Sequence, residues 1–331
     1  DYPPLSHRFA KTQIMLIMRK RRRFYDGKMN HVYQRTEGWV NIFYCDADYL
    51  VYYTIFAVCA KAAKIQVLML CLMYDHTHFL ARAENIRELS AFIDRSASWF
   101  VKEYNHQVGR KGKLLHKNFG SAPKWSDKDV RSAINYVGNN PVEKGLCSKA
   151  EEYRWNFLAY AVSDHPISEK YVPREASKHL RSAIKEAKEM ADQNLPLKYV
   201  HLKRMMKKLS RKELEQFIDQ VIIMYLPFDF NKAISYFGSY EAMIDAMHHN
   251  TGSEHDIKEH NDRASHIVFK DVLAYLGDTM PSNEIRKITV LSESDKCQLA
   301  RKIRSLFPIS EWQICKFLHI SSEKVGSNGG A

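Results

Sequence analysis

The chain has 331 residues, enough for two domains, and 45% hydrophobic with 27% charged residues is typical of a globular protein with a full core. Its 50 basic against 38 acidic residues give a net charge of +12, which favours a polyanionic partner, nucleic acid before an anionic membrane surface. No apolar stretch is long enough for a membrane-spanning helix or a signal peptide, and the six cysteines form no CxxC pair, so we expect neither a membrane anchor, a zinc cluster nor a disulfide framework.

A basic run near the N-terminus is the first feature along the chain. Residues 18–25 (MRKRRRFY) carry five consecutive cations followed by two aromatics, a combination of charge and stacking surface that suits nucleic acid. A run of charge is also typical of a solvated protein face, and the sequence does not decide between the two. Three of these cations, Arg21, Arg22 and Arg23, are candidate nucleic-acid-binding residues.

Two strands and a helix are predicted next. Residues 28–36 (KMNHVYQRT) have the composition of a strand, whereas residues 46–64 place large apolar side chains on one helical face. Residues 65–74 (IQVLMLCLMY) show no helical period, and their length and apolar content predict a strand buried on both faces. We therefore expect this strand, with His76 and His78 at its end, at the centre of a sheet.

A histidine pair follows that apolar run. In a strand, side chains alternate between faces, so His76 and His78 point the same way and Thr77 points to the other face. Two imidazoles side by side can hold one metal ion. The alternative is a hydrogen-bonded core histidine beside a solvent-facing one, and the spacing alone does not decide between them.

A long helix and a basic loop come next. Apolar residues from Ile86 to Phe100 describe a helix that ends near Asn105, and residues 109–113 (GRKGK) form a basic loop punctuated by glycine. This loop and the lysines after it supply cations for a phosphate backbone. The candidates are Arg110, Lys111, Lys113, Lys117 and Lys124.

The following helix is predicted to begin at Ser126, which has the serine-to-acid spacing of a capping box, and to end at Asn140, before Pro141. Gly138 within it costs about 1 kcal/mol relative to alanine, which indicates packing or function at that turn. Tyr136 lies four residues before Asn140, so a hydroxyl and an amide oxygen project from one helical face.

The second half of the chain has no strand signals. Amphipathic segments recur, so residues 165–325 are predicted to form an all-helical second domain after a first domain of residues 1–164. Residues 295–325 outline a helix-turn-helix, with two simply packed helices as the alternative, and residues 326–331 (GSNGGA) are treated as an appended tail. No metal site is predicted from the histidines in or near a polar loop of mixed charge, which are His248, His249, His255 and His260.

Four segments carry a family resemblance: CLMYDHTHFL, YNHQVGRKGKLLHKNF, INYVGNNPVEKGL and YRWNFLAY. In this order and at these spacings they resemble the single-tyrosine HUH transposases, particularly the REP-associated tyrosine transposases. The resemblance covers roughly Lys28 to Tyr160, and an ordered set of four segments is far more specific than one HxH pair. It implies an α+β fold, the HUH nuclease fold, in which helices flank a ferredoxin-like sheet.

The resemblance also implies residue roles. His76 and His78 match the paired metal-binding histidines, Tyr136 matches the nucleophile before the family's NPV segment, and Asn140 matches the position that completes the metal site. Nitrogen and oxygen ligands without thiolate suit Mg²⁺ or Mn²⁺ as the divalent metal. Tyr104 on the preceding helix is a rival nucleophile, but the NPV segment favours Tyr136.

The activity that the resemblance implies is metal-dependent nicking and joining of single-stranded DNA through a 5′-phosphotyrosine intermediate. This transesterase reaction serves DNA transposition and recombination, and repeated palindromic or hairpin sites are the expected targets. The expected partner is single-stranded or hairpin DNA and no membrane, the expected location is the cytoplasm at the nucleoid, and a homodimer is left open.

Two other functions remain open. Thr77 replaces a bulky apolar residue of the family and Asn118 replaces an arginine, and these departures leave room for a domesticated DNA-binding protein of the same fold without turnover. A replication or conjugation initiator of the wider HUH group is the other alternative, and the NPV segment argues against it.

Overall fold

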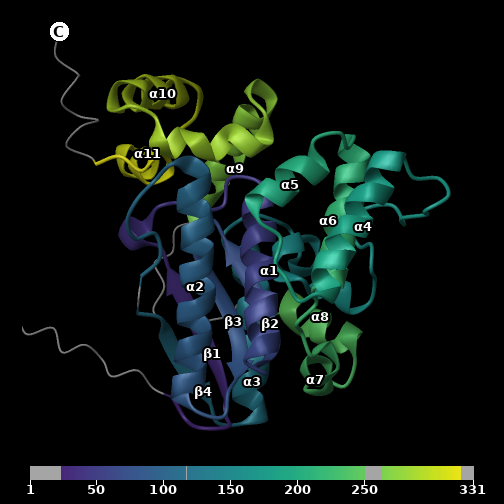
Figure 1. The fold of residues 1–331 in the computed structure, drawn as a ribbon. Coiled ribbons are helices and arrows are strands. Elements are labelled where there is room, and N and C mark those ends of the chain that lie inside the picture. The colour runs from purple at the N-terminus through teal and green to yellow at the C-terminus, as the bar shows by residue number, and fades with distance from the viewer. Residues whose placement is uncertain (1–23, 117, 250–262, 322–331) are drawn as a thin grey trace, which may run out of the picture.

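The first half of the chain builds a four-stranded antiparallel sheet (Figure 1). The computed structural model describes residues 24–116, 118–249 and 263–321. The sheet elements are β1 (Met29–Arg35), α1 (Asp46–Ala62), β2 (Gln66–Met73), β3 (His76–Arg82), α2 (Ile86–Val108) and β4 (Gly120–Lys124). They follow the β-α-β-β-α-β order of ferredoxin-like proteins, with the strand order β2-β3-β1-β4, which confirms the predicted mixture of helices and sheet.

The apolar run and the histidine pair lie on two strands of one hairpin. Strand β2 ends at Met73, Tyr74 and Asp75 make the turn, and β3 begins at His76. The expectation that the histidine pair lies at the end of the apolar strand is therefore wrong. The pair does lie on a central strand, since β3 is between β2 and β1, but the apolar strand β2, which was expected at the centre, is at the edge of the sheet. Because a two-residue Tyr-Asp turn lacks the glycine or asparagine-glycine that marks most tight hairpins, the sequence does not reveal it.

The two faces of the sheet bury different residues. Helices α1 and α2 cover one face, shown in front of the strands in Figure 1, where Val32 and Phe79 pack with Phe92. Helix α3 (Asp127–Glu143) covers the other face, and Leu80 belongs to that second cluster. Alternation along β3 thus sends neighbouring residues into separate cores.

Helix α3 begins as predicted. The Ser126 hydroxyl accepts a hydrogen bond from the Asp129 amide (3.2 Å), and the Asp129 carboxylate accepts one from the Ser126 amide (3.0 Å). The predicted end at Asn140 is wrong, because the helix continues for three more residues with Pro141 inside its last turn. Proline removes one backbone donor, but the Lys144 amide still donates to the Asn140 carbonyl (3.1 Å), so the turn closes without it.

The described residues beyond 165 form helices joined by loops, as predicted, with no strand among them. The helices are α4 (Lys178–Asp192), α5 (Tyr199–Met206), α6 (Arg211–Met224), α7 (Phe230–Ser235), α8 (Tyr240–His248), α9 (Arg263–Thr279), α10 (Glu293–Leu306) and α11 (Glu311–Leu318), and the short 3-10 helices of the chain are η1 (Glu37–Trp39), η2 (Ala150–Glu152), η3 (Arg154–Asn156), η4 (Leu158–Ala161) and η5 (Ser282–Val290). Helices α4 to α6 share the core of α1 and α2, and α8 to α11 share that of α3. The domain boundary near residue 165 stays a prediction.

Gly138 lets α8 approach α3 closely. A Cβ at this position would lie 2.7 Å from Sδ of Met247, nearer than real Cβ contacts allow. The neighbouring Asn139 side chain donates a hydrogen bond to the Met247 carbonyl (2.6 Å). The glycine therefore serves packing, which is one of the two reasons that its position in the sequence suggests.

The proposed helix-turn-helix contains two helices, α10 and α11, at the predicted place. Residues 313–318 of α11 are all buried, and residues 322–325 lie outside the described ranges. DNA reading by this pair stays a prediction. Among the helices that the structure describes, none is long and apolar enough to cross a membrane. The six cysteines all lie in described segments and form no disulfide.

Candidate active site

The two histidines of β3 lie side by side on the face that α3 covers. Their ring centroids are 4.9 Å apart with the rings nearly perpendicular, and both side chains are buried. Thr77 between them points to the other face, where its hydroxyl lies 3.3 Å from the Tyr52 hydroxyl. Because side chains alternate along a strand, the HxH spacing brings both imidazoles to the same sheet face.

A third histidine, His31 on β1, contacts this pair. Its Nε2 lies 3.0 Å from Nδ1 of His78, and its side chain is fully buried. One of these nitrogens donates and the other accepts, so the contact fixes the ring orientation of His78 and couples its tautomer to that of His31. Sequence reasoning missed His31, because only the strand pairing brings β1 beside β3.

Asp75 holds the other histidine in the same way. Its Oδ1 lies 2.6 Å from Nδ1 of His76, a charge-assisted hydrogen bond. Both histidines therefore use Nδ1 for a protein partner, as metal-ligating histidines commonly do. Nε2 of His76 is buried and has no hydrogen-bond partner among the described residues, so it fits a metal ion as its partner.

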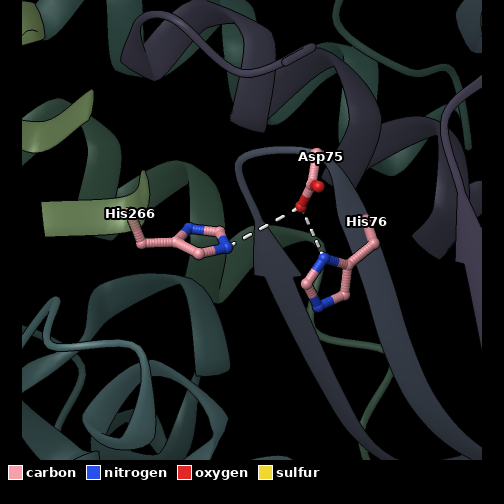
Figure 2. A group of neighbouring side chains, drawn as sticks. All are labelled: Asp75, His76 and His266. Atoms are coloured by element: carbon pink, nitrogen blue, oxygen red, sulfur yellow. Dashed lines mark hydrogen bonds and ion pairs between the residues drawn. The ribbon is translucent and has the colours of Figure 1, made fainter. Parts of the chain in front are cut away.

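Two helices from the C-terminal half reach the same carboxylate, α9 through His266 (Figure 2) and α11 through Lys316. Nε2 of His266 on α9 lies 3.8 Å from Oδ1 of Asp75, and Nζ of Lys316 on α11 lies 3.6 Å from Oδ2. Burial by itself would raise the pKa of Asp75, but His76, His266 and Lys316 together hold the pKa of that carboxyl well below its ordinary value. Asp75 is therefore an ionised, buried carboxylate that links the β2–β3 turn to two distant helices.

Two neighbouring groups could hold a divalent ion, and they share His76. In the first, ligand atoms of Asp75, His76 and His266 all lie within 4.8 Å of one another. There, however, the 2.6 Å contact of Asp75 with His76 is a hydrogen bond, and the Lys316 ammonium already supplies a positive charge. The second group is Nε2 of His76 with His78, whose ring centroids lie 4.9 Å apart.

Tyr136 on α3 packs against His31 and His78, on the sheet face that α3 covers. Its ring centroid lies 5.8 Å from that of His78 and 5.5 Å from that of His31. Asn140, one turn further along the helix, is fully buried, and Tyr136 is 5% exposed. The structure therefore brings the predicted phenol beside the predicted metal ligands and places the amide on the same helix.

The rival tyrosine is in a different core. Tyr104 on α2 is fully buried with its ring 5.8 Å from that of Phe100, in the cluster between α1 and α2. Burial raises the pKa of Tyr104 well above its ordinary value. Since the metal-ligand candidates face α3 across the sheet, Tyr104 is not part of this site.

The predicted DNA-binding cations have different surroundings. Arg110 donates to the Asn105 side chain (3.0 Å) and the Lys113 carbonyl (2.6 Å), so its guanidinium closes the loop after α2. Lys111 and Lys113 are exposed on that loop, whereas Lys124 is buried. The remaining candidates lie outside the described residues, and these are Arg21, Arg22, Arg23 and Lys117.

The histidines set aside as metal ligands also have ordinary surroundings where they are described. His248 pairs with Glu151 (3.0 Å), and Nδ1 of His249 donates a hydrogen bond to the Asp245 carbonyl (2.8 Å). His255 and His260 lie outside the described ranges.

Comparisons with known proteins are sparse for this chain. No family model matches it, and no curated protein matches it. A solved structure of a REP-associated tyrosine transposase bound to a REP hairpin is similar over 43% of this chain and 83% of that chain, with 15% sequence identity and a TM-score of 0.37. At that score the likeness carries no argument about function.

Proposed function

We propose that the chain is a metal-dependent enzyme that cuts and rejoins single-stranded DNA. In this proposal His76, His78 and Asn140 hold a divalent cation, and Tyr136 is the nucleophile. The observation that carries it is the packing of the Tyr136 ring against His78, next to the buried, unsatisfied Nε2 of His76. A candidate nucleophile and a candidate metal-ligand pair thus lie in one buried cluster of side chains.

The donor types suit the reaction. Two imidazole nitrogens and an amide oxygen are compatible with Mg²⁺ or Mn²⁺, and such an ion, when bound, polarises the scissile phosphate and neutralises its developing charge. A free phenol has a pKa of about 10 and is a poor nucleophile at neutral pH. The site therefore also accelerates the reaction by holding the Tyr136 hydroxyl in the orientation that attack on the phosphate requires.

The bond changes define the products. The Tyr136 oxygen forms a bond to phosphorus while the bond from phosphorus to the 3′ oxygen breaks. The phenol loses its proton, and the leaving 3′ oxygen gains one to become a free 3′ hydroxyl. The resulting phosphotyrosine ester keeps the energy of the phosphodiester, so a 3′ hydroxyl can reverse the step without ATP. This is why one tyrosine serves both cutting and joining.

A DNA-binding protein without turnover is the second candidate. The feature that favours it is the low exposure of Tyr136, 5%, which obliges the neighbouring elements to move before a phosphate reaches the hydroxyl. The two candidates differ in one product, the covalent adduct.

The test uses the full-length chain, Mn²⁺ and end-labelled single-stranded hairpins made from palindromes that flank its own gene. The proposed function predicts a labelled band that migrates with the protein under denaturing conditions and a new free 3′ hydroxyl, both absent in EDTA. Binding of the hairpins without any adduct would support the second candidate. A blunt duplex of the same sequence is the control and should give no adduct.

Asp75→Asn is expected to weaken Mn²⁺ binding by roughly 10- to 100-fold, because an outer partner that orients a metal-ligating histidine typically contributes that much. The measurement is a calorimetric Mn²⁺ titration without DNA. The matched control is Asp164→Asn, which alters an exposed Asp-His pair of similar geometry (2.8 Å to His165) away from the site. Since Asp75→Asn also leaves Lys316 without its full counter-charge, thermal unfolding is measured in parallel, and unchanged Mn²⁺ affinity in a folded variant would show that Asp75 does not orient His76.

A further inference from the structure

An aromatic and cationic strip lies next to the histidine pair on the same sheet face. In the β1–β3 register Tyr33 is opposite His78, and Arg35 is opposite His76. Directly opposite residues of an antiparallel pair project to the same side. Tyr33 and Arg35 are half-buried, whereas the histidines are buried, so this strip is the edge of the site that opens to solvent.

Gly120 makes room for the Tyr33 ring. Gly120 is the register partner of Tyr33 on the edge strand β4, and a Cβ there would lie 1.9 Å from Cε1 and 2.6 Å from Cδ1 and Cζ of the ring. The ring therefore lies across the glycine backbone, where any side chain would displace it. Its centroid is 6.2 Å from that of His78, with an angle of 30° between the ring planes.

Arg35 links this ring to a second aromatic. Its guanidinium carbon lies 4.4 Å from the Trp39 ring centroid and 5.8 Å from the Tyr33 ring centroid. Trp39 is 36% exposed and has a φ of 62°, a left-handed conformation that is rare for a bulky residue. The backbone at η1 thus accepts strain while Trp39 stacks on the guanidinium.

The charges around the strip favour an anion. The Leu114 carbonyl accepts a hydrogen bond from the Glu37 amide (2.9 Å), which places the loop carrying the exposed Lys111 and Lys113 beside η1. Of the nearby acidic groups, Glu37 pairs with His116 (2.9 Å) and Asp75 pairs with His76 (2.6 Å). Arg35 and the two lysines therefore face a ligand with cationic groups next to flat aromatic surface.

We propose that Tyr33, Arg35 and Trp39 form a subsite for one unpaired nucleotide of single-stranded DNA, adjacent to the phosphate that the histidine pair faces. This proposal rests on the proposed function and names where the substrate strand is held. The Tyr33 ring stacks on the base, and the Arg35 guanidinium, pre-oriented on Trp39, binds a phosphate. Bases inside a duplex have no free face for such stacking, so the subsite selects single strands.

The test is fluorescence anisotropy of a labelled single-stranded oligonucleotide in EDTA, where no cleavage interferes. Tyr33→Leu is expected to weaken binding by roughly 5- to 100-fold, the range for the loss of one base–aromatic stack, and Gly120→Ala should do the same by displacing the ring. Gly277→Ala, which has no atom within 4 Å of its added Cβ, is the matched control and should bind as the wild type does. Neither Tyr33→Leu nor Gly120→Ala should change the affinity for a duplex of the same sequence.

Arg35→Gln is expected to lower the slope of log affinity against log salt by about one, because it removes one phosphate contact. Wild-type affinity in Tyr33→Leu, together with an unchanged salt slope in Arg35→Gln, would overturn the subsite and leave these residues a structural stack. If the wild-type chain still forms the covalent adduct in that case, the proposed function stands without the subsite. If the wild-type chain binds no single-stranded DNA at all, both proposals fail.

Discussion

Replacement of His76 or His78 by alanine is expected to abolish Mn²⁺-dependent cleavage of single-stranded DNA. We also expect Mn²⁺ affinity to fall by more than roughly 100-fold, beyond the loss caused by removal of an outer partner. Each change deletes an imidazole that a neighbouring residue holds in place. His31 on β1 holds the His78 ring, and Asp75 in the turn holds the His76 ring. DNA affinity in EDTA should change little, since the ion serves the transition state more than the ground state.

The measurements for these variants are a calorimetric Mn²⁺ titration and a gel assay of cleavage. Thr77→Val is the matched control, because it lies between the two histidines but points to the opposite face, toward Tyr52. It should keep both Mn²⁺ binding and cleavage. Retention of Mn²⁺ affinity in His78→Ala together with its loss in His266→Ala would instead place the ion in the Asp75, His76 and His266 group.

Tyr136→Phe is expected to bind DNA and Mn²⁺ as the wild type does but to form no covalent adduct. The change removes only the attacking oxygen, and the ring keeps its packing against His31 and His78. Loss of the covalent nucleophile eliminates the reaction rather than slowing it. The measurement is the denaturing gel of the labelled hairpin reaction, with thermal unfolding as the check on folding.

Tyr104→Phe is the control for this prediction. Tyr104 lies in the opposite core, so its loss should leave adduct formation unchanged. Adduct formation that persists in Tyr136→Phe and disappears in Tyr104→Phe would show that the nucleophile was assigned to the wrong helix.

Local pattern was sufficient for the parts of the site that depend on one element. The same-face placement of His76 and His78 follows from strand alternation, and the start of α3 follows from the capping box at Ser126. The shared face of Tyr136 and Asn140 follows from helical spacing. These features need no knowledge of what the elements pack against.

The features that the sequence did not reveal depend on tertiary contacts. His31 reaches His78 only because β1 pairs with β3 in one register, and Lys316 reaches Asp75 from a helix more than two hundred residues away in sequence. The hairpin turn at Asp75 lacks a glycine signal, so the residue that orients His76 could not be recognised as the turn between two strands. The sequence also does not show that Lys124 is buried whereas Lys111 and Lys113 are exposed, because the exposure of a lysine depends on the tertiary structure.

The central claim is that Tyr136 forms the covalent bond to DNA, and peptide mapping of the trapped adduct by mass spectrometry tests it most directly. Trypsin separates the two tyrosines, because residues 132–144 (SAINYVGNNPVEK) contain Tyr136 and residues 103–110 (EYNHQVGR) contain Tyr104. We expect a nucleotide mass on the 132–144 peptide, with fragment ions that locate it on Tyr136. A nucleotide on the 103–110 peptide, or on any residue other than Tyr136, would contradict the account.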